Sequence, residues 1–269
     1  MAKHHRVRLG QVFLADRRIE GRIISALCLQ SSDVVFEIGA GPGNMTARLA
    51  EAAGKVVAAE LDPQWVGQLQ ERFADNSRVI VLHADILRVA MDDVAESSGA
   101  KRIKVFGNLP YYITSPCLLH LFRYCQWIEE ITVMVQREVA DRITAAPGSK
   151  DYGLLSVTCQ YYTQPQLLFT IPPSAFHRPP KVDSALVKMK VAPQKAALRV
   201  ADEELFWRWM RAAFAQKRKT LLNNWKHLCD PARLRATLEE QGIDPRTRAE
   251  TLSLAQLACL HLAQMQDGR

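Results

Sequence analysis

The sequence predicts an α/β protein with a parallel sheet covered by helices on both faces, followed by a small all-helical domain. In the first 140 residues, short apolar runs alternate with amphipathic segments of helical spacing. Several of these runs are apolar throughout, which is typical of parallel strands buried on both faces. From Asp202 onward only helical spacing occurs. We therefore expect a first domain over residues 1–193 and a helical domain over residues 194–269.

The expected strands are short, and most end at glycine or polar residues. They cover residues 34–38, 55–60, 78–82, 102–107, 131–135 and 184–191. Helices are expected after the N-cap signals Asp16, Asp62-Pro63 and Ser115-Pro116, and through Met45 and Leu49. Prolines punctuate residues 165–180, and residues 192–200 resemble a linker. In the last part we expect helices near 202–214 and 216–227, one from Asp230 to Gly242, and one from Ser253.

Composition narrows the class of protein. The 269 residues are 48% hydrophobic and 23% charged, which is ordinary for a globular chain. No run has the roughly 18 apolar residues of a membrane helix, and the N-terminus leads into no apolar signal core. Six scattered cysteines form no Cys-x-x-Cys pair, so we expect buried thiols in a reducing cytoplasm and no metal site.

The charge favours a polyanionic partner. The net charge is +7, with a pI near 9.2. The segment 208–229 contains six basic residues and no acidic one, with tryptophans interleaved or adjacent. A solvated helix face above core tryptophans is the plain structural interpretation, but the local absence of carboxylates favours a surface that contacts phosphates. The candidate RNA-binding residues are Arg211, Lys217, Arg218 and Lys219.

The tetrapeptide Asn108-Leu109-Pro110-Tyr111 is the strongest chemical signal. It follows the apolar run 103–106, so it lies where a strand ends at the carboxyl edge of the sheet. Asn108 offers an amide oxygen, Leu109 a backbone carbonyl and Tyr111 an aromatic face. Together these groups can hold a flat base that carries an exocyclic amino group.

Three other strand ends complete a cofactor pattern. Gly39-x-Gly41-x-Gly43 follows the first strand, Glu60 ends the second and Asp85 follows the third. Each of these features is weak alone, because glycine turns and capping acids are common. Glycine lets a ligand approach the backbone closely, Glu60 can accept from ribose hydroxyls, and Asp85 can accept from an adenine amino group. The set describes a pocket for an adenosine-bearing cofactor without pyrophosphate.

Here the chain resembles a known family. Residues 35–41 are similar to motif I of class I S-adenosylmethionine-dependent methyltransferases, and Asn108-Leu109-Pro110-Tyr111 is similar to their motif IV in its rRNA-adenine form. Four further segments resemble the KsgA (RsmA) family of dimethyladenosine transferases, which act on small-subunit rRNA; they are Leu9-Gly10-Gln11-Val12-Phe13-Leu14, residues 175–184, residues 213–221 and Arg248-Ala249-Glu250-Thr251-Leu252-Ser253. The match covers essentially the whole chain.

The resemblance implies a Rossmann-like class I methyltransferase domain with a small all-helical C-terminal domain that binds rRNA. It implies S-adenosyl-L-methionine as cofactor and, as target, two adjacent adenosines near the 3′ end of 16S rRNA in the small ribosomal subunit or its precursor. Each adenosine would receive two methyl groups on N6, and the family also has a role in subunit assembly. No membrane partner is implied, and we expect a monomer.

The resemblance also implies roles for individual residues. The expected cofactor-binding residues are Gln11, Val12, Leu14, Gly39, Gly41, Glu60, Leu61, Asp85, Ile86 and Asn108. The expected catalytic residues are Asn108, Leu109, Pro110, Tyr111 and Phe176, with Tyr111 and Phe176 stacking on the two faces of an extruded adenine. Without the resemblance, Phe176 would be interpreted as an ordinary core aromatic in a proline-rich loop. The chain departs from the family pattern at Val12, where Asn or His is usual, and at Arg178, where Pro is common.

Several alternatives remain open. A large-subunit rRNA adenine methyltransferase has a similar motif IV, although residues 176–184 and 248–253 favour the small-subunit enzyme. DNA adenine and protein glutamine methyltransferases usually carry Asn/Asp-Pro-Pro-Tyr instead. A non-catalytic ribosome-assembly or nucleic-acid-binding factor would not require Asn108, Glu60 and Asp85 to be intact. An NAD-dependent dehydrogenase would explain Gly39 and Glu60 but not the turn at Asn108.

Overall fold

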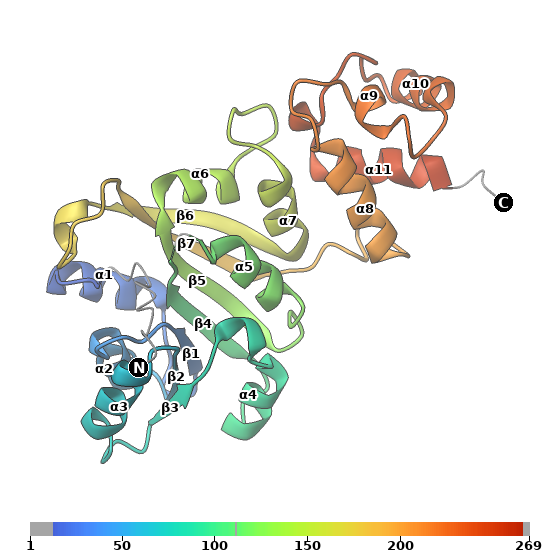
Figure 1. Cartoon of the computed structure of the whole chain (residues 1–269). Helices are drawn as coiled ribbons and strands as arrows, with labels where there is room; N and C mark the ends of the chain where they lie inside the picture. Colours follow the sequence, from blue (N-terminus) through green and yellow to red (C-terminus); the bar gives the residue numbers. More distant parts are fainter. Residues whose placement is uncertain (1–12, 111, 266–269) are drawn as a thin grey trace, which may run out of the picture. The chain divides into compact units, whose positions relative to one another are not determined.

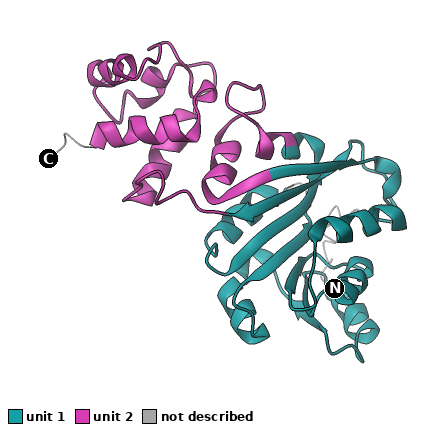
Figure 2. Cartoon of the chain, turned by 180° about the vertical axis from the view of Figure 1, so that it is seen from behind, with its two compact units in different colours: residues 1–140, 166–191 teal, residues 141–165, 192–269 magenta. Residues whose placement is uncertain are grey.

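A computed structural model describes residues 13–110 and 112–265 of the chain. The chain divides into two compact units (Figure 2): one contains Met1–Ala140 and Gln166–Val191, the other Asp141–Pro165 and Ala192–Arg269. The first unit is called the sheet unit below, and the second the helical unit. The sequence predicts a single boundary near residue 193. In the structure a second segment, residues 141–165, also belongs to the helical unit.

One seven-stranded sheet has the strand order β3-β2-β1-β4-β5-β7-β6 (Figure 1). Its strands are β1 (Val34–Ile38), β2 (Lys55–Glu60), β3 (Val79–His83), β4 (Ile103–Asn108), β5 (Ile128–Gln136), β6 (Thr163–Ile171) and β7 (Ser184–Val191). The pairs β3–β2, β2–β1, β1–β4 and β4–β5 are parallel, while β5 and β7 pair in antiparallel orientation. The predicted strands are confirmed, with β5 beginning three residues earlier than expected.

Helices cover both faces of the sheet. On one face, α1 (Arg17–Leu27), α2 (Asn44–Ala52) and α3 (Pro63–Arg72) pack with Val35, Val56 and Ala58 in one buried cluster. In Figure 1, α4 (Met91–Ser98) and α5 (Thr114–Phe122) lie on the opposite side, with η1 (Ile86–Arg88) before α4. All five residues of β1 are buried, as a central parallel strand requires.

The N-caps predicted at Asp16 and Asp62 are confirmed, whereas the one at Ser115 is wrong: α5 begins at Thr114 after Ile113, without a side-chain cap. The Asp16 carboxylate accepts from the backbone N–H of Arg18 and Ile19 at the start of α1. The Asp62 carboxylate accepts from Gln64 N–H at the start of α3, with Pro63 as the first helical residue. These oxygens satisfy N–H groups that have no partner within the helix.

Strand β6 was not predicted. Its sequence, Thr-Gln-Pro-Gln-Leu-Leu-Phe-Thr-Ile, contains Pro165, which cannot donate to a strand ladder. The strand order places β6 at the edge of the sheet, where one side of the strand needs no ladder partner, and proline is tolerated there. The neighbouring helices α6 (Arg137–Thr144) and α7 (Leu154–Tyr162) and the short η2 (Pro173–Ala175) also went unpredicted.

The helical unit continues with α8 (Glu203–Ala213), α9 (Leu221–Trp225), α10 (Pro231–Glu240), η3 (Ala249–Thr251) and α11 (Leu254–Met265). The helix expected over residues 216–227 is wrong: only residues 221–225 are α-helical, and Thr220 caps them by accepting from Asn223 N–H. The preceding residues 217–219 form a turn instead. Trp209 and Trp225 are buried, and Trp225 Nε1 donates to the Trp209 carbonyl at 3.0 Å.

No helix in the described part of the chain is both long enough and apolar enough to cross a bilayer.

His261 on α11 lies in the core of the helical unit. It is 4% exposed, and its ring contacts Phe206 and Trp209 at centroid distances of 5.5 and 5.3 Å. Within the described residues its Nδ1 has no hydrogen-bond partner. Burial lowers the pKa of His261 below its usual value, and the charge of Asp202 opposes this only in part. The unfolded chain therefore binds the proton more readily than the folded chain does.

We expect the helical unit to lose stability as the pH falls below about 6.5, the usual pKa of histidine, because protonation favours the unfolded state. A His261→Leu variant should lose less between pH 7 and pH 5 than the unsubstituted chain does. Urea unfolding followed by tryptophan fluorescence measures this, since Trp209 and Trp225 share the cluster. Equal losses in both proteins would contradict the prediction.

Candidate active site

The register of the parallel strands brings three predicted site residues to one edge of the sheet. Ile38 pairs with Ala59 of β2 and with Gly107 of β4, so the next residues are Gly39, Glu60 and Asn108. Glu60 pairs in turn with His83, two residues before Asp85. The carboxyl ends of β1 to β4 therefore meet at the edge where open parallel sheets bind ligands.

The glycine loop after β1 needs glycine for two different reasons. Gly39, Gly41 and Gly43 have φ values of +72°, +53° and +81°, which L side chains rarely adopt. At Gly41 a Cβ atom would also lie 2.4 Å from Phe13 Cε1, whereas at Gly39 it would meet nothing within 4 Å. Gly39 is exposed. The loop thus packs tightly at Gly41 and leaves open space beside Gly39.

The Glu60 carboxylate joins this loop to the end of β2. Its Oε2 accepts from Gly41 N–H at 2.8 Å, and its Oε1 accepts from Leu61 N–H at 2.8 Å and Asp62 N–H at 2.9 Å. Glu60 is only 1% exposed. In this structure its described contacts therefore hold the backbone of the two loops, and a contact with a ribose remains a prediction.

Asp85 lies after β3 and is half-buried. Its Oδ1 accepts from Leu87 N–H at 3.0 Å, which makes it the N-cap of η1. The next residue, Ile86, is 6% exposed, whereas Leu61 after β2 is 46% exposed. The end of β2 thus exposes an apolar side chain at Leu61, and the loop after β3 offers the Asp85 carboxylate.

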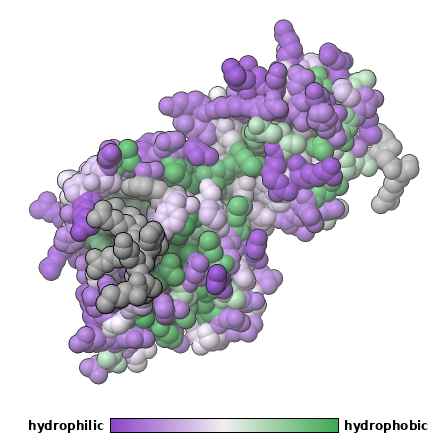
Figure 3. All heavy atoms as spheres, in the orientation of Figure 1, coloured by the Kyte–Doolittle hydropathy of each residue, from purple (hydrophilic) through white to green (hydrophobic). Residues whose placement is uncertain are grey.

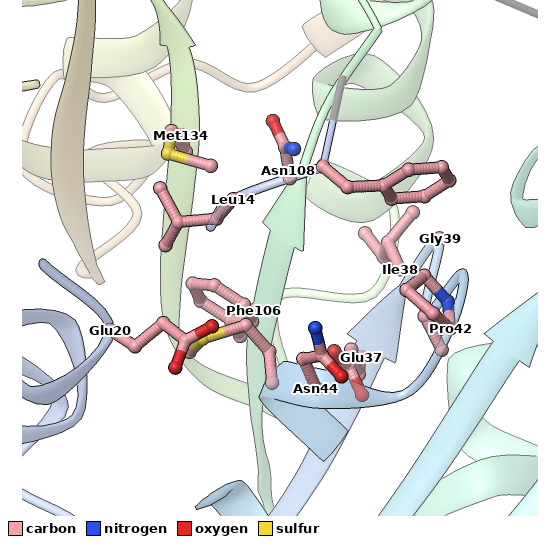
Figure 4. A pocket seen from close by; sticks show the side chains of 13 residues that line it. Leu14, Glu20, Glu37, Ile38, Gly39, Pro42, Asn44, Phe106, Asn108 and Met134 are labelled. Atoms are coloured by element: carbon pink, nitrogen blue, oxygen red, sulfur yellow. The ribbon is translucent and has the colours of Figure 1, made fainter. Parts of the chain in front are cut away.

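Asn108, the last residue of β4, lines a pocket with Gly39 and Leu14 (Figure 4). The next residue, Leu109, is buried, and its N–H donates to the Met134 carbonyl at 3.0 Å. The Pro110 carbonyl accepts from Ile113 N–H at 3.1 Å, closing a turn. Tyr111 lies outside the described residues, as do Gln11 and Val12.

Phe176, to which the resemblance gives a stacking role, lies in the core of the sheet unit. It is 5% exposed and packs in the same buried cluster as Leu14, with which it forms a β-bridge. Next to it, His177 N–H donates to the Phe13 carbonyl at 3.0 Å. Phe13 and Leu14 line the pocket, while Phe176 is absent from its described lining. Phe176 thus supports the pocket wall, and its ring presents little surface for stacking in this structure.

Several pocket residues were missed from the sequence. Phe13, Glu20, Glu37, Asn44, Phe106 and Met134 line it together with the predicted ones. In the view of Figure 4, the carboxyl groups of Glu20 and Glu37 lie below Asn108. The side chain of Phe106 lies between them and Asn108. The sequence did contain a signal for Glu37, because it is an acidic residue within an apolar strand. Carboxyl groups are rarely buried unless they are paired, so such a residue is a candidate for a site.

Glu37 and Glu20 give the pocket an acidic lining. Burial raises the pKa of the Glu37 carboxyl to about 8, the Thr46 hydroxyl opposes the rise by donating to Oε2 at 2.5 Å, and the charge of Glu60 adds to it. Glu20 is 5% exposed, and its Oε2 accepts from Arg48 Nε at 2.7 Å. Glu37 is therefore neutral near pH 7, and the charge of Glu20 is paired with Arg48, so these two groups make the lining polar without leaving a free negative charge.

The candidate RNA-binding residues belong to the helical unit. Arg211 near the end of α8 and the turn residues Lys217, Arg218 and Lys219 are all exposed. The tryptophans of this segment lie in or beside the core, as the plain structural interpretation has it: Trp209 and Trp225 are buried, and Trp207 Nε1 donates to the Tyr162 hydroxyl at 3.1 Å. The basic and the aromatic residues of this segment therefore have different roles.

A Glu37→Gln variant should be more stable than the unsubstituted chain at pH 8.5 and nearly equal to it at pH 4.5. The raised pKa means that stability is greatest below about pH 4.5 and falls as the pH rises toward 8, because the unfolded chain loses this proton first. The full effect is on the order of 3–5 kcal/mol. Glu51→Gln, on the exposed side of α2, is the matched control in chemical unfolding. A difference that does not depend on pH would contradict the assignment.

Comparisons with known proteins agree with this geometry. The family model for ribosomal RNA adenine dimethylase matches residues 2–263. The ribosomal RNA small subunit methyltransferase A of Caldanaerobacter subterraneus subsp. tengcongensis is 42% identical over 253 residues, which are 93% of this chain and 94% of the relative. The protein of the same name from Acidobacterium capsulatum is 43% identical over 257 residues, 95% of this chain and 90% of that one.

Two solved structures have the same fold. The dimethyladenosine transferase of Plasmodium falciparum matches with a TM-score of 0.75 and 23% identity, covering 93% of this chain and 96% of that one. The 23S rRNA methyltransferase ErmE matches with a TM-score of 0.73 and 24% identity, covering 94% and 100%. The expected Rossmann-like methyltransferase fold is thus confirmed. With a family model matching nearly the whole chain, the protein belongs to the ribosomal RNA adenine dimethylase family, whose members are S-adenosylmethionine-dependent methyltransferases.

Proposed function

We propose that this enzyme dimethylates N6 of two adjacent adenosines near the 3′ end of 16S rRNA in the small ribosomal subunit or its precursor. The observation that carries the proposal is the position of Asn108, which ends β4 and lines one pocket with Gly39 and Leu14. Relatives more than 40% identical are named for the small subunit. The likeness to ErmE supports the fold alone, so it does not favour a large-subunit substrate.

The residues at the sheet edge suit S-adenosylmethionine. When bound, this cofactor supplies an electrophilic methyl group on a positively charged sulfur. The open space at Gly39 leaves room for a ligand, and Asn108, Glu37 and Glu20 put polar groups in the pocket that could bind it. We assign cofactor contacts to Leu14, Gly39, Gly41, Glu60, Leu61, Asp85, Ile86 and Asn108, together with Gln11 and Val12 beyond the described residues.

Asn108 and Leu109 would hold the target amine. The N6 lone pair of adenine is delocalised into the ring, so the amine is a poor nucleophile, and alignment matters more than a strong base. The Asn108 Oδ1 and the Leu109 carbonyl would accept from its two N–H groups and stabilise the positive charge that develops on N6. After the first methylation only one N–H remains, so one acceptor loses its partner.

The target adenine must leave its stack to reach this turn. Tyr111 is our candidate for stacking on one face of the base, and Pro110 would shape the turn that presents it. A stacking role for Phe176 would require its ring to leave the core cluster in which it lies. Base–aromatic stacking contributes on the order of 1–3 kcal/mol per base.

The C-terminal helices from residue 194 onward are proposed to bind the rRNA through Arg211, Lys217, Arg218 and Lys219, which are exposed. Contacts of basic side chains with phosphates are independent of sequence and weaken with salt. We further propose that the enzyme acts as a cytoplasmic monomer and has a role in subunit assembly. A purely non-catalytic assembly factor is the second candidate, and an activity assay separates the two.

Asn108→Ala should lower methyl transfer about 100-fold or more while leaving RNA binding nearly unchanged, because the variant lacks an acceptor that acts on the reacting amine. Purified protein is incubated with labelled S-adenosylmethionine and unmodified small subunits, and the label is mapped on the rRNA by mass spectrometry.

Asn76→Ala is the matched control, since it removes the same amide before β3, at the opposite end of the strands from Asn108. Near-normal turnover by Asn108→Ala would refute the acceptor role. Binding of subunits without any methylation by the unsubstituted enzyme would instead favour the assembly factor.

A further inference from the structure

Three segments of the helical unit that lie far apart in the sequence meet at one surface. They are the loop 146–151, the turn 215–219 and the segment 244–250. Together they carry six exposed basic residues, which we call the cationic surface: Lys150, Lys217, Arg218, Lys219, Arg246 and Arg248. Figure 3 shows many hydrophilic residues on the face of this unit that is in view.

Lys217 connects the turn to the loop. Its Nζ donates to the Lys150 carbonyl at 2.8 Å. One ammonium of the basic triplet is therefore bound to the protein's own backbone. The bond also places the backbone of Lys150 beside the turn, although the two residues are 67 positions apart in the sequence.

Other contacts fix the same arrangement. Gly148 N–H donates to the Glu250 carbonyl at 2.8 Å, and Leu221 N–H donates to the Thr247 carbonyl at 2.8 Å. At the end of the loop, the rings of Tyr152 and Phe214 meet edge to face at 6.2 Å. The loop is therefore held on both sides.

The charges on this surface are not equivalent. Arg246 binds the Asp244 carboxylate at 2.9–3.2 Å, and Arg248 lies 3.8 Å from a Glu250 carboxylate oxygen. Among the described residues, no ion pair involves Lys150, Arg218 or Lys219. These three side chains are the strongest candidates for an external anion.

We infer that Lys150 contacts a backbone phosphate of the rRNA and that Lys217 positions it by binding its carbonyl. The inference rests on the proposed rRNA substrate and adds the loop 146–151 to the RNA-binding surface. Lys150 then acts beside Arg218 and Lys219, whereas Lys217 acts mainly through the loop. Contacts of this kind set affinity and orientation without reading bases.

The test measures binding of the full-length protein to unmodified 16S rRNA over a series of salt concentrations. Lys150→Gln should reduce the slope of log K against log salt by about 1, the value for one lost phosphate contact. Lys101→Gln, an exposed lysine just before β4 at the other end of the sheet from Asn108, removes the same charge and should leave the slope unchanged. Equal slopes for the two variants would overturn the role of Lys150.

The positioning role of Lys217 is tested by a double-mutant cycle. In a Lys217→Gln background the loop loses its bond to the turn at the Lys150 carbonyl and keeps its contact with Glu250, so Lys150→Gln should have less effect than it has alone. Additive effects would overturn the positioning role. Calorimetric binding of S-adenosylmethionine should be unchanged in all these variants, which shows that the sheet unit is intact.

The result also separates this inference from the proposed function. If the unsubstituted protein neither binds nor methylates 16S rRNA, the proposed substrate is wrong and the inference falls with it. If it does both, and Lys150→Gln behaves like Lys101→Gln, the inference alone fails.

Discussion

The buried carboxylate of Glu60 holds together the two loops that shape the cofactor edge of the sheet. It accepts from the backbone of Gly41 after β1 and from Leu61 and Asp62 after β2. The parallel register of β1 and β2 brings these two loops close together. Beyond the ends of the strands the β1–β2 ladder stops, and there the Glu60 carboxylate joins the two loops by hydrogen bonds. A glycine loop with φ values near +50° to +80° has few intrinsic constraints, so this ionic group gives it a defined shape.

The two units differ in the ionisable groups that they present. The pocket of the sheet unit is lined by acidic groups, and one of them, Glu37, holds its proton up to about pH 8 because it is buried beside Glu60. The helical unit exposes basic residues that belong to three segments. The pocket thus holds a neutral carboxyl and an ion-paired one, while the cationic surface suits a polyanionic substrate.

Much of the site could be predicted because chemistry and local structure coincide there. Gly39, Glu60, Asp85 and Asn108 all follow apolar strands, and parallel strands bring their ends to one edge. Phe176 shows the limit. From its residues alone Phe176 would be an ordinary core aromatic in a proline-rich loop, and only the resemblance gave it a stacking role; in the structure its ring lies in the core cluster with Leu14. The helix predicted over residues 216–227 is also wrong in its first part. The spacing of side chains alone does not show that residues 217–219 form a turn and that the helix begins only after Thr220.

By itself the sequence determined six of the seven strands, the helix caps at Asp16 and Asp62 and the residue types at the strand ends, because these depend on near neighbours and on burial periodicity. Only the tertiary structure decided which groups meet. Strand β6 exists in spite of Pro165 because the strand order puts it at an edge. Glu37 became part of the pocket, and Lys150 came beside Lys217, through contacts between residues distant in the chain. Such contacts depend on how the elements pack, which no local pattern encodes.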